Sequence, residues 1–497
     1  MRCAALVLLA ACGADAPLVA PVLDTPPATS EAYPYEGLTE VTLSVTRLGE
    51  EEVSRTVPFG DTLEIGDIRF GEELVIHVTG SNETGEVAYG RTCAFDIGED
   101  SPATVEPHLW LSRLVKWGAA AVPVEPQRTG GLAWALPDGS AAFAGGSRGL
   151  AGDAPVAGGV ERFDPLDTGA FADVEVALGE RTGARLAAFP DGRAIICGGV
   201  VPSSVVPDTM DATGGVELID PRPGRDLRYQ LVAEGPRLRH HAAATLVDGR
   251  IVVAGGETQS ADGQPFAITG QAYIFDIGEG GDLAAPILLP AGMTTPRAEH
   301  TFTRLSNEPG ADVLIIGGRD DAGLPVGSVE VFRPLSDDFE PLGATMQRAR
   351  WGHVAVRLPG GFVLVIGGWK PDPLGGPDPV RVDEMELYDP VLGLFTLTGS
   401  LSPTAGLTEL TVTPLPDGRV LLAGGRNQTG AAVATTLIAQ LDPVNGRVNI
   451  IATNSLSVPR AGHSAVPLCD GTILLVGGTD DPAAPAERYN PPAAGRR

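Results

Sequence analysis

Arginines and histidines recur in register along this chain, and they are the first candidates for chemistry. Five repeats carry an arginine in one column, and a sixth places Arg239 beside that column, where Leu238 stands; these residues are Arg128, Arg181, Arg239, Arg297, Arg350 and Arg460. The remaining repeat has Leu407 in the column. A guanidinium group presents a rigid fork of N–H donors that suits carboxylates and sugar hydroxyls. The column therefore predicts a ring of arginines that binds a protein or a glycan.

A structural role is the alternative, in which each arginine bonds backbone carbonyls between neighbouring repeats. Repetition in register favours it, because a ligand seldom needs the same contact from every repeat. The histidines three residues further on, His241, His300, His353 and His463, are open to the same two interpretations. One histidine per repeat does not make a metal site, so we expect no metal and no cofactor. Trp369, in a variable loop, is the best single candidate for an exposed contact, because tryptophan is enriched at binding hot spots.

The elements that position these residues are marked by an apolar run that ends in a pair of glycines. The pair recurs at 145–146, 198–199, 255–256, 317–318, 367–368, 424–425 and 477–478, at intervals of 50 to 62 residues. Such a period, with strand-like runs, is typical of blade arrays. Six of the seven copies have a turn glycine shortly before the pair, preceded in five by aspartate as in Asp138-Gly139, a strong hairpin signal.

Each repeat continues with a longer loop, an acidic-apolar strand that ends near Asp-Pro, and a fourth strand, as at Glu386–Pro390 and Leu394–Thr398. Consecutive apolar residues require burial on both faces, which a β-propeller provides. We therefore predict an all-β chain with a seven-bladed propeller over residues 111–491, in which 111–122 supply the last strand of the seventh blade. The loops after Gly-Gly and the loops that enter each first strand share one side, called here the long-loop face, which is the default binding face.

These motifs closely resemble the Kelch repeat: an apolar run, Gly-Gly, a tyrosine such as Tyr388 and an aromatic residue seven positions on, here Phe395. The resemblance implies a propeller similar to the central domain of galactose oxidase. In such oxidases copper is held by Tyr and His beside a Cys–Tyr cross-link, whereas Cys197 here stands in an apolar run, so the copper interpretation is poor. A sugar-modifying enzyme, an oxidase or isomerase, stays the alternative to a non-catalytic binding module.

The N-terminal segment predicts export. A single basic residue and a short apolar run lead to Leu9-Ala10-Ala11-Cys12, which resembles a bacterial lipobox with Cys12 as the acylated residue; an ordinary cleaved signal is the alternative. We expect residues 1–12 to be the signal, 13–36 an Ala/Pro-rich tether, 37–110 a small Ig-like β-sandwich and 492–497 a tail. The predicted protein is a monomeric lipoprotein of a bacterial envelope, held on the outer membrane or at the periplasmic or cell surface.

Composition narrows the partners. The net charge of −28, with only two lysines, repels phosphates and predicts no nucleic-acid partner. Contact with a membrane is expected through the lipid anchor only. After removal of Cys3 and acylation of Cys12, three cysteines remain, which cannot all pair within the chain. We expect Cys197 to be a buried apolar residue.

Overall fold

A computed structural model describes the parts of the chain discussed below. These are residues 8–11, 18–19, 21–61, 64–68, 71–98, 101–102, 104–123, 128–148, 154–155, 159–165, 170–174, 178–179, 181–207, 209–222, 224, 229–232, 235–278, 280–401, 407–442, 444–481 and 483–491. In these ranges regular structure is almost entirely β, and the 3₁₀ turn η1 (Pro359–Gly361) is the one helical element. None of the described helical structure has the length and apolar character to cross a bilayer. Cys12 and the tail 492–497 lie outside the described residues.

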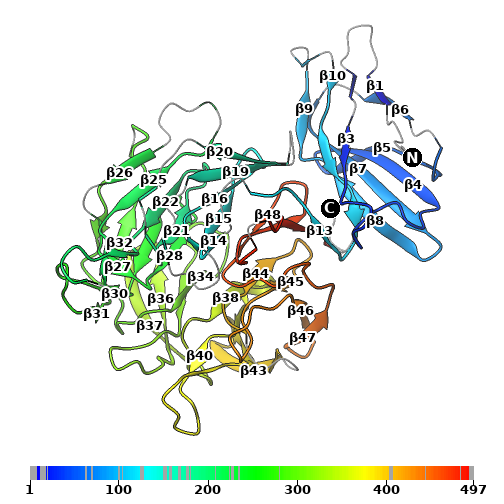
Figure 1. The fold of residues 1–497 in the computed structure, drawn as a ribbon. Helices are drawn as coiled ribbons and strands as arrows, with labels where there is room; N and C mark the ends of the chain where they lie inside the picture. Colours follow the sequence, from blue (N-terminus) through cyan, green and yellow to red (C-terminus); the bar gives the residue numbers. More distant parts are fainter. Residues whose placement is uncertain are drawn as a thin grey trace.

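The N-terminal domain is a β-sandwich, drawn in blue in Figure 1. Its larger sheet joins β12 (Ser112–Arg113), β8 (Gly85–Arg91), β7 (Gly71–Asn82), β4 (Glu40–Arg47) and β5 (Glu50–Pro58), with β9 (Phe95–Ile97) also on β7. Two smaller sheets contain β10 (Thr104–Val105), β2 (Leu18–Val19), β1 (Leu8–Ala11) and β6 (Glu64–Ile68), and β11 (His108–Trp110) with β3 (Val22–Asp24). Their shared core includes Leu43, Val45, Leu74 and Ile76, because alternate residues of each strand face inward.

The tether predicted over residues 13–36 differs from what the structure shows for its described part. β3 pairs with β11, and the Ala32 side chain is fully buried. Arg113 bonds the carbonyl oxygen of Tyr33 through Nε at 3.2 Å. Pro-rich composition was mistaken for an extended linker, but here the segment satisfies its backbone groups against the sandwich. The sandwich domain thus begins before residue 37, and it extends to β12 at Arg113.

The propeller has seven four-stranded antiparallel sheets (Figure 1), as the repeat count predicts. The strands of each blade are given from the inner to the outer one. Blade 1 contains β15 (Leu132–Ala135), β16 (Ala141–Ala144), β19 (Val160–Asp164) and β20 (Ala170–Val174), and blade 2 contains β21 (Arg185–Ala188), β22 (Ala194–Cys197), β25 (Val216–Ile219) and β26 (Tyr229–Val232). Blade 3 contains β28 (Ala242–Thr245), β29 (Ile251–Ala254), β32 (Ala272–Phe275) and β33 (Ile287–Leu288), and blade 4 contains β34 (Thr301–Arg304), β35 (Val313–Ile316), β36 (Ser328–Arg333) and β37 (Asp338–Thr345).

Blades 5 to 7 follow the same order. They are β38 (Val354–Arg357), β39 (Val363–Ile366), β42 (Glu384–Asp389), β43 (Leu394–Ser400); β44 (Thr411–Pro414), β45 (Val420–Ala423), β46 (Thr436–Asp442), β47 (Arg447–Ala452); and β48 (Ser464–Pro467), β49 (Ile473–Val476), β50 (Glu487–Tyr489), β13 (Trp117–Ala119). The second strand of every blade is buried at all four positions, because other blades cover both of its faces.

Additional short strands lie on the long-loop face. They are β14 (Arg128–Thr129), β17 (Ser147–Arg148), β18 (Ala154–Pro155), β23 (Val200–Pro202), β24 (Met210–Ala212), β27 (Leu238–Arg239), β30 (Glu257–Thr258), β31 (Ala267–Ile268), β40 (Trp369–Lys370) and β41 (Val380–Arg381). β27, β30 and β31 form one small sheet, and β40 pairs with β41.

The ring of blades is closed. The innermost strands of neighbouring blades contact one another all the way round, including β15 of blade 1 with β48 of blade 7. The outer strand of blade 7 comes from the other end of the propeller sequence: β13 pairs antiparallel with β50, Trp117 opposite Tyr489. Sharing one sheet between both ends of the repeat array removes two open sheet edges.

The sandwich also contacts blade 7 directly. Cys93 and Cys469 form a disulfide between the two, which leaves Cys197 as the buried free cysteine among the described residues. The Arg488 guanidinium lies 4.6 Å from the Trp110 ring centroid, and Asn490 donates to the carbonyl oxygen of Tyr89 at 2.7 Å. Covalent, cation–π and hydrogen-bond contacts therefore meet at the blade that carries the closing strand.

Candidate functional site

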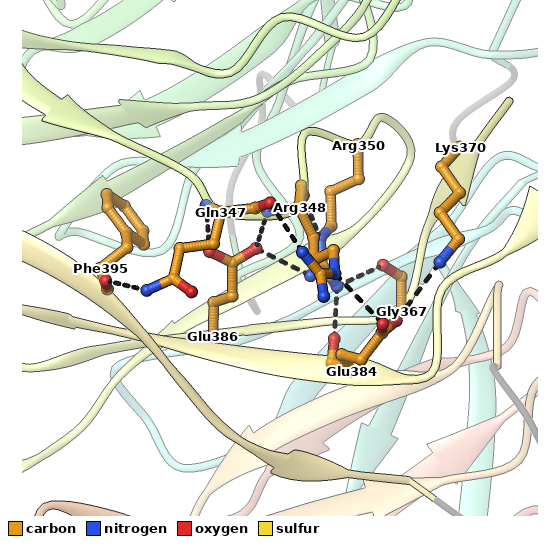
Figure 2. A network of polar contacts seen from close by, with 8 residues as sticks. All are labelled: Gln347, Arg348, Arg350, Gly367, Lys370, Glu384, Glu386 and Phe395. Atoms are coloured by element: carbon orange, nitrogen blue, oxygen red, sulfur yellow. Dashed lines mark hydrogen bonds and ion pairs between the residues drawn. The ribbon is translucent and has the colours of Figure 1, made fainter. Parts of the chain in front are cut away.

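The arginine column is buried inside the blades, as Arg350 illustrates in Figure 2. Its Nη2 donates to Glu386 Oε1 at 2.9 Å, and its Nη1 donates to the carbonyl oxygens of Gly367 at 3.2 Å and Glu384 at 2.8 Å. Glu386 also accepts the backbone N–H of Gln347 at 2.7 Å. The side chain of Arg350 is 0% exposed, so no ligand reaches it.

The same clasp repeats in four other blades. Each column arginine bonds the first glycine of its own pair and a glutamate on the third strand; the ion pairs are Arg128–Glu161, Arg181–Glu217, Arg297–Glu330 and Arg460–Glu487. Its carbonyl oxygen reaches the preceding blade, as when Gly318 N–H donates to Arg350 at 2.9 Å. These five predicted ligand contacts are thus buried in the structure, and their guanidinium groups bond within the fold.

The two blades without the arginine also lack its acid partner. In the register where Val365 faces Glu386, blade 3 has Val253 facing Tyr273 and blade 6 has Leu422 facing Leu437. Leu238 and Leu407 thus lose the guanidinium together with the carboxylate. Joint replacement avoids an uncompensated buried charge. That covariation between repeats was the signal in the sequence for a structural role.

The column histidines are packing residues too. His241, His353 and His463 are buried, and burial together with nearby guanidinium groups lowers the pKa of each to about 3. His353 and His463 each have a threonine partner on the preceding blade: Thr301 Oγ1 lies 3.0 Å from His353 Nε2, and Thr411 Oγ1 lies 2.8 Å from His463 Nε2. Neutral imidazoles therefore fill the space against the glycine pairs of neighbouring blades.

A second ring of residues surrounds the mouth of the central channel. Two positions after the arginine column, every blade adopts the left-handed backbone conformation, at Gly130, Gly183, His240, Glu299, Gly352, Glu409 and Gly462. Backbone bonds link several of them across blades, as when Glu299 N–H donates to His240 O at 2.9 Å. Glycine adopts this conformation without strain, whereas His240, Glu299 and Glu409 are strained in it. Strained non-glycine residues of this kind cluster at functional sites.

The non-glycine members of this ring carry a charged network. Arg319 bridges Glu299, at 2.7 Å, and Glu257, at 2.8 Å, and His240 Nδ1 lies 3.3 Å from Glu257. Burial acts to raise the pKa of Glu257, but His240, Arg319 and Arg239 outweigh it and hold that pKa at about 2. On the far side Glu409 pairs with Arg426 at 2.9 Å. Each carboxylate at the mouth thus has a guanidinium partner.

Two of the predicted site residues, Arg239 and Trp369, are partly exposed on the long-loop face. Together with Phe266 and Trp351 they form what is called here the rim. The Arg239 guanidinium sits 3.5 Å from the Phe266 ring centroid and bonds Glu257. Trp369 is half-buried, its ring centroid lies 4.3 Å from the guanidinium carbon of the buried Arg381, and its backbone pairs with that of Trp351. The structure therefore keeps Arg239 and Trp369 together with other rim residues, while it removes the buried arginines from the site.

Inside the mouth is a cavity of about 680 Å³ formed by the inner strands. It is lined by Arg185, His300, Phe302, Val354 and the mouth residues Glu299 and Glu409. Arg185 was not predicted. Its register holds Leu132, Ala242, Thr301, Val354, Thr411 and Ser464 in the other blades, so the signal was a single charge in an otherwise uncharged column.

The described residues contain no group of three or more His, Cys, Asp or Glu side chains that could hold a metal ion. Cys197 is 1% exposed, and burial raises the pKa of its thiol to about 12. That thiol stays protonated at neutral pH, in keeping with its prediction as a buried apolar residue.

Known proteins share parts of this repeat array. The chain is 26% identical to beta-scruin of Limulus polyphemus over 290 residues, 57% of this chain and 29% of that protein. It is 27% identical to alpha-scruin of the same animal over 208 residues, 39% of this chain and 21% of that protein, so less than a third of either relative is spanned.

A solved structure described as "Structure of YjhT" covers 67% of this chain and 99% of its own, with a TM-score of 0.48 and 15% identity. No protein-family model matches the chain. The seven four-stranded sheets, with the Gly-Gly repeat that builds them, make this chain a Kelch-like β-propeller preceded by a β-sandwich.

Proposed function

We propose that this protein is a recognition module that binds a protein or a glycan on its long-loop face, around the mouth of the central channel. The observation that carries the proposal is the strained ring: three of seven equivalent positions hold His240, Glu299 and Glu409 where glycine would be free of strain. Backbone strain of roughly 1–3 kcal/mol at each such position is retained where the side chain has a functional role.

The composition of the rim supports the same conclusion. Trp351, Trp369 and Phe266 are partly exposed, and the guanidinium groups of Arg239 and Arg381 stack on two of these rings. Tryptophan and arginine dominate the energetics of protein interfaces, and aromatic rings also stack on sugars. Stacking on Phe266 fixes Arg239 in place, so less side-chain entropy is lost when a ligand binds.

We further propose that the protein works outside the cytoplasm, attached to a bacterial envelope through lipid on Cys12. The Cys93–Cys469 disulfide supports export, because such bonds persist in oxidising compartments. Cleavage before Cys12 would remove β1 and leave β2 and β6 in the N-terminal domain. Fatty-acid labelling in a bacterial host should mark the wild-type chain and not Cys12→Ser; equal labelling of both would refute the anchor.

The binding proposal is tested with glycan and peptide arrays probed with the full chain. A double variant, Arg239→Ala with Trp369→Ala, removes two rim contacts whose side chains are not part of a blade core. Its matched control is Arg333→Ala, an exposed, ion-paired arginine at the end of β36 on the opposite face. We expect the double variant to lose at least about 10-fold in affinity and the control to lose none. If the double variant retains every captured ligand, the long-loop face is the wrong surface.

A further inference from the structure

The central channel contains an arginine, Arg185, that forms no ion pair with any described residue. Arg185 begins β21, and its Nε donates to the carbonyl oxygen of His241 in the next blade at 3.0 Å. Among the described residues no carboxylate forms an ion pair with its guanidinium, unlike Glu299 and Glu409 at the mouth, which Arg319 and Arg426 neutralise. The side chain opens to the lumen, but protein surrounds that lumen, so burial lowers the pKa of Arg185 despite the nearby Glu299.

His300 also borders the channel. It is 4% exposed and lines the cavity, and neither of its ring nitrogens has a hydrogen-bond partner among the described residues. The reason is visible in the repeat: Thr301 and Thr411 supply a hydroxyl to the histidine of the following blade, whereas Ala242 stands in that register before His300. Both nitrogens are buried away from the lumen, so His300 contributes a ring to the cavity wall and no donor to a ligand.

Part of the remaining wall is apolar. Phe302 and Val354 are partly exposed to the lumen, and the Phe302 ring lies 5.3 Å from the His300 ring. A cavity of about 680 Å³ falls within the range of small-molecule sites, which combine apolar walls with a few converging polar groups. A guanidinium fork binds a planar carboxylate through two parallel hydrogen bonds.

We propose that the channel binds a small monocarboxylate with an aromatic or branched aliphatic body, its carboxylate on Arg185 and its body along Phe302 and Val354. One negative charge suffices to pair with Arg185. Arg319 and Arg426 are already paired with Glu299 and Glu409, so a dianion gains no second cationic contact from them. This site is independent of the rim, so it does not require that the rim binds a macromolecule.

The test uses benzoate and its neutral isostere benzamide as probes of the full chain, by isothermal titration calorimetry. We expect benzoate to bind at least about 10-fold more tightly than benzamide, since a hydrogen-bonded charge pair is lost in the amide. Arg185→Gln should weaken benzoate binding at least about 10-fold. Arg333→Gln, the matched arginine on the opposite face, and Trp369→Ala, on the rim, should leave it unchanged, which separates this site from the proposed macromolecular surface.

Inorganic phosphate, a third probe, should bind more weakly than benzoate. The proposal is overturned if Arg185→Gln binds benzoate as the wild type does, if benzamide and phosphate bind equally well, or if the wild type binds no benzoate in the millimolar range expected of so small a ligand. Melting curves of Arg185→Gln provide the check on folding. Because Arg185 carries an unpaired charge, that variant should melt no lower than the wild type, so loss of binding cannot be assigned to unfolding.

Discussion

Arginine side chains in this protein fall into two groups: those whose N–H donors bond within the fold, and those whose donors are still available to a ligand. The guanidinium group of Arg350 donates hydrogen bonds to Glu386 and to two carbonyl oxygens of its own blade. Arg185 retains most of its hydrogen-bonding capacity inside a cavity. Both are arginines near the start of an inner strand, and only the bonding pattern around them separates a structural residue from a binding one.

Removing one partner of the clasp should cost more than removing both. Arg350→Leu leaves Glu386 buried at 0% exposure without its guanidinium, for which we expect a loss of about 3–5 kcal/mol in the free energy of unfolding. The double variant Arg350→Leu with Glu386→Leu copies blade 6, which has Leu407 and Leu437, and should be more stable than either single variant. Urea denaturation measures all four chains; additive losses would contradict the clasp.

The buried histidines make stability depend on acid. His241, His353 and His463 have pKa values of about 3, and burial and the neighbouring arginines lower the pKa of His300 well below its usual value. Histidines in the unfolded chain take up protons below about pH 6.5, whereas these four stay neutral. The unfolded state then binds more protons, so the free energy of unfolding falls as pH falls from about 6.5 toward 3, by up to about 1.4 kcal/mol per pH unit for each histidine.

Replacing one of these histidines isolates its contribution. His300→Phe places a ring of similar size where neither imidazole nitrogen had a partner. The slope of unfolding free energy against pH between pH 6 and pH 4 should decrease by about one proton's worth relative to wild type. An unchanged slope would mean that His300 is already protonated in the folded chain.

At the scale of the elements, the closing strand has the largest leverage. Trp117 in β13 is 7% exposed, stacks 5.1 Å from Tyr489 and donates from Nε1 to Thr436 of blade 6 at 3.1 Å. Trp117→Ala should reduce the free energy of unfolding by about 3–5 kcal/mol, as for other large core truncations. The exposed Leu335, in a turn of blade 4, is the control: Leu335→Ala should change stability by less than about 0.5 kcal/mol. Equal effects would argue against a role for β13 in holding the ring together.

The strands and turns also show best how much of the structure could be predicted from the sequence. Gly367 shows why the repeat was readable: its φ is +67°, and a Cβ there would lie 2.2 Å from the carbonyl oxygen of Leu407 in the next blade, so only glycine fits. The positive φ recurs at the first glycine of all seven pairs and a similar close approach at five of the other six, so the repeat predicts the fold. Arg185 is the one charged residue in its register, glutamate stands at two of the seven mouth positions, Glu299 and Glu409, and the proximity of Arg185 to Glu299 depends on how blades are arranged round the axis. The fold could therefore be predicted from the repeat, whereas Arg239 and Trp369 are the parts of the candidate site that the sequence predicted.

Across the whole molecule, the sandwich and the propeller are joined where the ring closes. The Cys93–Cys469 bond ties residues 376 positions apart, and Lys116 near β13 pairs with Glu31 of the sandwich at 2.9 Å. Cys93→Ser should make the connection between Arg113 and Trp117 more sensitive to protease than in the wild type, because the domains can separate more often. Cys197→Ser, which breaks no disulfide, serves as the comparison for cysteine loss. Identical cleavage rates for wild type and Cys93→Ser would show that the other contacts suffice.

The central claim is that recognition takes place on the long-loop face around the channel. Hydrogen–deuterium exchange of the full chain, with and without a ligand selected on the arrays, tests it most directly. We predict protection in the segments that form the rim, 237–242, 257–268, 295–300, 349–353 and 369–381. Protection confined to the turns of the opposite face, 333–338, 389–394 and 442–447, would contradict the claim.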